Sequence, residues 1–134
     1  MTWYERLPVD AAVAGALAEA AGEVAPCRAG PFVTVSAVTG TAREARRLRR
    51  RYRAVCESME GAAAAHAALA FGIRFGEVRG ISNPVGPRDR RTWRTAEAAD
   101  RAQRTVLRFL ERLPRPGAGS GTLGPAGERI PGKR

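Results

Sequence analysis

The stretch that decides the fold covers residues 54–83 and reads AVCESMEGAAAAHAALAFGIRFGEVRGISN. It begins with a short apolar run over 54–58, which is typical of a buried β-strand. The alanine-rich residues 60–71 predict a helix that can approach a sheet closely, and Gly72 supplies a left-handed stop. Residues 73–82 then predict a further strand. The order strand, helix, strand indicates an α/β unit with parallel strands.

Upstream of this stretch, the pattern predicts a helix, a strand and a second helix. Asp10 is a suitable N-cap, Pro26 would stop the first helix, and its inward face would carry Val13, Leu17, Ala20 and Val24. The apolar run FVTVSAV over 32–38 predicts a strand buried on both faces. The arginine-rich residues 41–53 predict an amphipathic helix.

Downstream, the loop NPVGPRDRR leads to a final helix with Thr95 as its expected N-cap and an apolar side made of Ala99, Ala102, Val106, Phe109 and Leu113. Strands and helices alternate, so the expected fold class is α/β with a largely parallel sheet. Only three strands are expected, which makes a poor independent domain with an unpaired edge. The folded part is expected over 1–114, followed by a disordered glycine- and proline-rich tail over 115–134.

The chain is strongly basic, with a formal net charge of +10. The densest cluster, over 41–53, also contains a stripe at helical spacing: Ala42, Ala45, Leu48 and Tyr52. We therefore interpret its arginines as the solvated face of a helix, with phosphate or nucleic-acid contact as the alternative. Nucleic acid is not an expected partner, because the cluster lacks interleaved aromatics and a recognition motif.

Several other classes of protein are disfavoured by the sequence. Cys27 and Cys56 stand far apart without histidine partners, which indicates neither a zinc site nor a disulfide framework. No metal or cofactor is expected. The chain has no run of about eighteen apolar residues and begins without signal-peptide features, so we expect no membrane span and a cytoplasmic location.

Candidate ligand-binding residues follow the predicted strands. Ligands of open α/β sheets bind beyond the carboxyl ends of the strands, which here are followed by Val38 and Thr39, by residues 57–60, and by Ser82 and Asn83. A carboxylate at this edge can accept hydrogen bonds from two vicinal hydroxyls and stabilise a developing cation. The expected ligand has a flat ring and a polyhydroxyl portion.

Three segments, GPFVTVSAVTGT, CESMEGAAAAH and EVRGISNPVGPRDR, carry a resemblance to a known family. From about residue 31 to residue 110 the chain resembles the purine nucleoside phosphorylase and nucleosidase superfamily, and within it the futalosine hydrolases. The resemblance implies a partial phosphorylase/hydrolase-like fold. It covers only the carboxyl-terminal half of the family's fold, which implies a truncated gene product, a misplaced start or half of a split enzyme.

The resemblance implies roles for individual residues. Met59 and Glu60 align with the family's ribose site, where the glutamate holds the sugar hydroxyls. Ser82 and Asn83 align with residues that meet the purine, and asparagine stands where related methylthioadenosine nucleosidases have aspartate. A neutral amide suits N7 and O6 of a 6-oxopurine, so hypoxanthine fits better than adenine. Val38 stands where those enzymes carry a stacking aromatic, so only apolar contact with the base is expected.

The implied reaction is hydrolysis of the N-glycosidic bond of futalosine through an oxocarbenium-like transition state, releasing hypoxanthine in menaquinone biosynthesis. Asn83 would activate the leaving purine. In this family the water-activating glutamate lies in the amino-terminal half, so this chain alone is expected to be inactive. The expected partners are a purine nucleoside and either that other half or a further copy of the chain.

Plainer interpretations stay open for these residues. Glu60 could serve only as an N-terminal helix residue that interacts with the helix dipole, and Met59 could belong to the core. Asn83 before proline could simply initiate a turn. Arg88 and Arg90 could be solvated loop charges, or one of them could pair with the benzoate of the substrate. Glu57 is interpreted as structural.

The alternative for the whole chain is a non-catalytic remnant that serves as a basic binding or interaction module.

Overall fold

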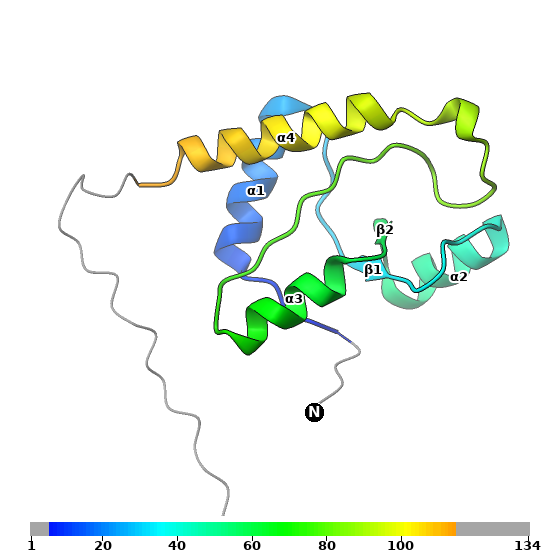
Figure 1. Cartoon of the computed structure of the whole chain (residues 1–134), viewed down its shortest axis with the longest axis horizontal. Coiled ribbons are helices and arrows are strands. Elements are labelled where there is room, and N and C mark those ends of the chain that lie inside the picture. The colour runs from blue at the N-terminus through cyan, green and yellow to red at the C-terminus, as the bar shows by residue number, and fades with distance from the viewer. Residues whose placement is uncertain (1–5, 115–134) are drawn as a thin grey trace, which may run out of the picture.

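The computed structural model describes residues 6–114, and the expected tail over 115–134 lies outside them. Figure 1 shows helices arranged around a very small sheet. The elements in chain order are α1 (Ala11–Val24), β1 (Phe32–Thr34), α2 (Ala42–Tyr52), β2 (Cys56–Ser58), α3 (Gly61–Ala70), a 3-10 turn (Arg90–Thr92) and α4 (Thr95–Glu111). The α/β class expected from the sequence is confirmed.

The sheet consists of two parallel strands, with Phe32 opposite Cys56 and Thr34 opposite Ser58. Bonds from Val35 N to Ser58 O and from Val55 N to Pro31 O, both 2.9 Å long, extend the pairing at its two ends. The strand predicted over 32–38 is therefore too long. A β-strand extends only as far as its hydrogen bonds to a neighbouring strand, and β2 has only three residues with which β1 can pair.

The strand predicted over 73–82 is wrong, because this segment is extended but belongs to no sheet in the described part of the chain. Its backbone binds helix starts instead: Phe75 O accepts from Asp10 N at 2.8 Å, and Ser82 O accepts from Arg94 N at 2.9 Å. Figure 1 shows it passing diagonally from α3 to α4. A ladder needs a neighbouring strand, and neither β1 nor β2 pairs with it.

The first helix forms as the sequence predicts. The Asp10 carboxylate accepts a hydrogen bond from Val13 N at 2.9 Å, and the helix ends at Val24, before Pro26. Its inward side buries Leu17 and Ala20. Asp10 also pairs with Arg74 at 2.8 Å, so the same carboxylate that caps α1 fixes the beginning of the extended segment.

The last helix differs from the prediction in its cap and in its buried side. Thr95 is its first residue and Arg94 occupies the N-cap position, because the bond to Ser82 O holds Arg94 there. The helix buries Ala98 and Thr105, whereas Ala99, Val106 and Leu113 of the predicted side are exposed.

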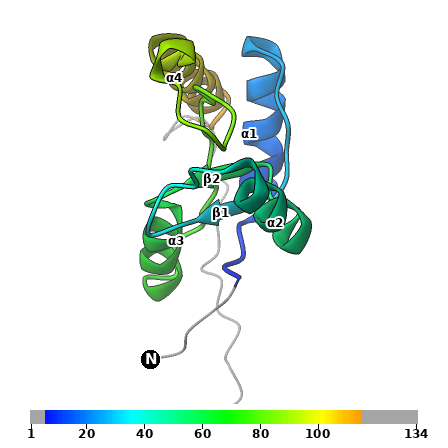
Figure 2. The ribbon, with the colours of Figure 1, turned by 90° about the vertical axis from the view of Figure 1, so that its right-hand side faces the viewer.

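The rotation of α4 is fixed by its neighbour α1, which packs beside it (Figure 2). Arg108 pairs with Glu23 at 2.9 Å, and Arg112 contacts both Glu19 and Glu23.

Glycine allows the extended segment to lie directly on both helices. A Cβ atom at Gly80 would overlap the carbonyl group of Ala98 in α4. One at Gly76 would come within 2.6 Å of Val13 Cγ1 in α1. A carbonyl oxygen inside a helix cannot move aside, so the contact at Gly80 requires glycine.

The core of the described residues is small. The buried apolar residues are Leu17, Ala20, Cys56, Ala65 and Ala98, and no large side chain among residues 6–114 is fully buried. The arginine-rich helix α2 buries no residue completely, although Ala45, Leu48 and Tyr52 on its predicted inward stripe are half-buried. None of the helices described is long and apolar enough to cross a membrane.

We expect Gly80→Ala to destabilise the fold by about 1–3 kcal/mol, because the methyl group meets helix backbone. The matched control is Gly15→Ala in α1, where the new methyl group meets nothing within 4 Å and helix propensity should raise the stability by about 0.5–1 kcal/mol. Chemical denaturation of both variants measures the difference. Equal stability of the two variants would contradict the close approach.

Stability should also depend on the charge of Asp10. The hydrogen bond from Arg74, and then that from Val13 N, lower the pKa of Asp10 from its ordinary value of 3.8. Because the folded pKa lies below the unfolded one, the ionised carboxylate stabilises the fold above pH 3.8, and this contribution is lost as the pH falls through the lowered pKa. In Asp10→Asn, which retains a good N-cap, this part of the acid dependence should be missing from thermal unfolding curves. Identical pH profiles for the two proteins would rule out the role of the charge.

Candidate functional site

The candidate site lies where β1 and β2 end. Thr39, in the loop after β1, is buried and donates its backbone N–H to Glu57 Oε1 of β2 at 2.9 Å. Val38, beside it, is exposed. The structure therefore brings the ends of the two strands together, as the parallel arrangement predicts.

The Glu57 carboxylate links the two strand ends through one of its oxygen atoms, and its other oxygen atom makes no hydrogen bond to the described residues. Its Oε1 binds the Thr39 N–H, while Oε2 is buried and has no hydrogen-bond partner among the described residues. The interpretation of Glu57 as structural agrees with the first contact. The second oxygen makes it a further carboxylate acceptor at the same strand end.

Glu60 occupies the N-cap position of α3 but makes no capping hydrogen bond. The N–H of Ala62 in the first turn binds Thr34 Oγ1 of β1 at 2.9 Å instead. The Glu60 side chain is 74% exposed, and Oε2 accepts from Met59 N at 3.3 Å. Glu60 is therefore not needed to cap the helix, and its carboxylate is accessible.

Met59 lies beside this carboxylate on the outside of the molecule. It is 48% exposed, so the alternative that places Met59 in the core is wrong for the described residues. A flexible thioether next to an accessible carboxylate offers an apolar contact for a ligand held by that carboxylate.

Arg79 also lies at this site, although the sequence pattern did not single it out. Its guanidinium lies 3.4 Å from Glu60 Oε2 and 2.5 Å from Glu77 Oε1. Burial lowers the pKa of Arg79, but the hydrogen bond to Glu77 and the nearby carboxylates together raise it by more, so the net shift of the pKa is upward. The signal was present in the pattern EVR, since residues two apart in an extended segment share a face.

The neighbours of this pair are closely packed. A Cβ atom at Gly61 would come within 2.8 Å of both Glu77 carboxylate oxygens, so a larger residue at this helix start would require the Glu77 carboxylate to shift. Cys56 is buried beside them, and burial raises the pKa of its thiol. A protonated buried thiol is a packing group here and a poor nucleophile.

The predicted purine-binding pair, Ser82 and Asn83, is half-buried and engaged locally. Ser82 Oγ donates to Asn83 Oδ1 at 2.7 Å, and Asn83 Nδ2 donates to Pro84 O at 3.0 Å. These contacts agree with the interpretation of Asn83 as a turn residue. In the described part of the chain no hydrogen bond or ion pair joins Asn83 to Glu60.

The two loop arginines gather around an aromatic ring. The guanidinium of Arg88 lies 5.3 Å from the centre of the Trp93 ring, and that of Arg90 lies 5.7 Å from it. Both arginines are exposed. Cation–π contacts of this kind fix their positions without neutralising their charge. Residues 6–114 contain no group of three or more histidine, cysteine, aspartate or glutamate side chains that could hold a metal ion.

We expect Glu57→Ala to loosen the loop that carries Val38 and Thr39, because the Thr39 N–H loses its acceptor. A net hydrogen-bond contribution of about 1 kcal/mol corresponds to roughly fivefold faster amide exchange at Thr39. Glu57→Gln retains an acceptor and should restore most of the protection. Glu111→Ala, at an exposed position on α4, is the control. Unchanged exchange at Thr39 in Glu57→Ala would show that this bond does not order the loop.

Comparison with known proteins shows similarity to three futalosine hydrolases. The futalosine hydrolase of Thermus thermophilus is 42% identical over 108 residues, which are 81% of this chain and 46% of that protein. The futalosine hydrolase of Streptomyces coelicolor is 51% identical over 83 residues (61% of this chain, 35% of that protein), and that of Acidothermus cellulolyticus is 55% identical over 65 residues (48% and 27%). The chain spans about half the length of these relatives or less. No solved structure matches it.

The resemblance to futalosine hydrolases is thereby confirmed over the matched part. Residues 4–111, most of the chain, match the family model described as the phosphorylase superfamily. Its α/β architecture, with parallel strands whose carboxyl ends carry the candidate site, agrees with that match. The chain belongs to the phosphorylase superfamily.

Proposed function

We propose that this chain is part of a nucleoside hydrolase that cleaves the N-glycosidic bond of futalosine, releases hypoxanthine and serves menaquinone biosynthesis in the cytoplasm. The observation that carries the proposal is the accessible Glu60 carboxylate at the end of β2, which is not used for capping and lies next to Met59 and Arg79. The similarity to three futalosine hydrolases supports the choice of substrate.

Glu60 is the proposed ribose-binding residue. Its two oxygens can accept hydrogen bonds from the two ring hydroxyls of a ribose, and its charge stabilises an oxocarbenium-like sugar as the bond breaks. Arg79, 3.4 Å away, contacts Oε2 and helps to orient the carboxylate. Because this contact is long and Glu60 is 74% exposed, a sugar hydroxyl can bind without first breaking a buried ion pair.

Asn83 is the proposed leaving-group residue. Its amide can form hydrogen bonds with N7 and O6 of a 6-oxopurine, with Ser82 beside it and Val38 and Thr39 forming the apolar side. The bonds to Ser82 and to Pro84 O must then be exchanged for bonds to the base. Arg88 and Arg90 are proposed to attract the carboxylate of the benzoate group.

The remaining requirement is a base that positions and activates water. We propose that a glutamate outside this chain, in the other half of the fold, performs this step, so that the chain alone is inactive. The active form then contains that other half or a second subunit as partner. Stabilisation of the transition state by Glu60 and Asn83 depends on this assembly.

Mixing the chain with the part of the Thermus thermophilus relative that lies outside the matched 108 residues should yield hypoxanthine release from futalosine. Glu60→Ala should lower that rate on the order of 100-fold or more, because a charged transition state loses its partner. Asp100→Asn, on the exposed side of α4, is the matched loss of one carboxylate and should leave the rate unchanged. Hypoxanthine is followed by chromatography. Full activity of the Glu60→Ala complex would refute the assignment.

The second candidate function, a basic interaction module without catalysis, is favoured by α2. This helix buries no residue completely and exposes Arg43, Arg46, Arg49 and Arg50. An assembled complex that releases no hypoxanthine but binds a polyanion with steep salt dependence would favour this function over hydrolysis.

A further inference from the structure

The first turn of α3 has an unusual arrangement of hydrogen bonds. An N-cap side chain ordinarily accepts a hydrogen bond from the backbone N–H of the second or third helical residue. Glu60 occupies the N-cap position of α3, but its carboxylate makes no such bond. The second and third residues of this helix are Ala62 and Ala63, so the partners of their N–H groups decide what the Glu60 side chain is free to do.

Both N–H groups already have acceptors. Ala62 N donates to Thr34 Oγ1 at 2.9 Å, and Ala63 N donates to the backbone carbonyl of Glu60 at 3.0 Å. Thr34 is the last residue of β1 and stands 28 positions before Ala62 in the chain. A hydroxyl group from the sheet therefore caps the helix, and neither N–H group is left for the Glu60 carboxylate.

The Ala62 N–H group needs an acceptor in the folded chain. Ala62 is half-buried, and α3 packs on β1 at this end. A polar group that is withdrawn from water without a partner destabilises the fold. If the Thr34 hydroxyl were absent, the N-cap side chain would be the acceptor within reach, and the positive end of the helix dipole would attract its charge. Thr34 and Glu60 therefore compete for one donor.

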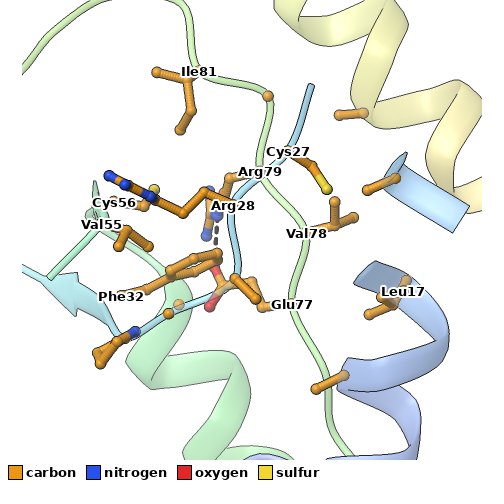
Figure 3. Close-up of a pocket in the computed structure, with 18 of the residues that line it drawn as sticks. Leu17, Cys27, Arg28, Phe32, Val55, Cys56, Glu77, Val78, Arg79 and Ile81 are labelled. Atoms are coloured by element: carbon orange, nitrogen blue, oxygen red, sulfur yellow. Dashed lines mark hydrogen bonds and ion pairs between the residues drawn. The ribbon is translucent and has the colours of Figure 1, made fainter. Parts of the chain in front are cut away.

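The Glu60 carboxylate is directed elsewhere in the structure. Its Oε2 accepts from Met59 N at 3.3 Å and lies 3.4 Å from the guanidinium of Arg79. Arg79 is held in turn by Glu77 at 2.5 Å (Figure 3). These contacts are all to groups outside α3, and they leave the Glu60 side chain 74% exposed. The carboxylate is accessible because the helix does not use it.

We propose that Thr34 is a positioning residue for the carboxylate that holds the ribose: its hydroxyl occupies the Ala62 N–H and so prevents Glu60 from folding back onto the helix. The ribose rests on the proposed function, whereas the competition between Thr34 and Glu60 does not. A carboxylate engaged as a cap would have to release the helix before it bound a sugar. The apparent affinity for substrate would then fall with the fraction of molecules whose carboxylate is free.

The first test is amide hydrogen exchange at Ala62 in the full chain, measured by NMR. Glu60→Ala should leave the rate unchanged, because Thr34 is the acceptor. Thr34→Val keeps the shape of the side chain, and its rate should stay within about twofold of the wild type because Glu60 replaces the hydroxyl. The double variant has neither acceptor and should exchange about fivefold faster or more.

Two outcomes of this experiment would overturn the proposal. Faster exchange in Glu60→Ala alone would show that Glu60 already caps the helix, and this comparison does not require any Thr34 variant to fold. Equal rates in Thr34→Val and the double variant would show that Glu60 does not take the donor. Thr34→Ser retains the hydroxyl and should match the wild type. Thr95→Val, the same change at an exposed position on α4, is the control.

The second test measures kinetics in the complex with the remaining part of the Thermus thermophilus relative. Thr34→Val should raise the KM for futalosine about fivefold and leave kcat within about twofold, because the cap competes only with substrate binding. Thr34→Ser should restore the KM. A lower kcat at unchanged KM would refute the positioning role. If the wild-type complex released no hypoxanthine, the proposed hydrolysis would fail, and exchange at Ala62 would still decide whether Thr34 frees Glu60.

Discussion

The structure depends on the close approach of one extended backbone to two helices. Residues 73–82 lie against α1 at Gly76 and against α4 at Gly80, where a side chain would meet Val13 or the carbonyl of Ala98. Hydrogen bonds at Phe75 O and Ser82 O tie the same segment to the starts of both helices. Among the described elements, α1 packs directly on α4 and α3 packs on β1, and this segment contacts both groups, through Gly80 at Ala98 and through Glu77 at Gly61.

This constraint also builds the candidate site. Once the backbone is fixed at its two ends, the alternation of an extended chain sends Glu77 and Arg79 toward β2 and α3, and Val78 toward α1 (Figure 3). Arg79 then reaches Glu60, and Glu77 packs on Gly61. The same few residues therefore position the Glu60 carboxylate. Glu60 stays accessible because Thr34 accepts from the first turn of α3 in its place.

The sequence by itself determined the local features. Capping by Asp10, the stop at Gly72 and the alternation of helices with the first two strands depend on neighbours within a few residues, and these predictions are confirmed. The edge where Val38, Thr39 and Glu60 lie also followed from the sequence, because the carboxyl ends of parallel strands share one side.

The tertiary structure alone decided which segments find partners. Residues 73–82 have the composition of a strand, but a ladder needs a neighbour that the described residues do not supply. The buried side of α4, with Ala98 and Thr105, is the side that packs against Gly80 and α1, and the apolar spacing of the helix did not identify it. Arg79 joins Glu60 across nineteen positions of the chain. Helix periodicity and capping depend on residues close together in the sequence. Strand pairing and side-chain contacts depend on residues that are distant in the sequence and that only the tertiary structure brings together.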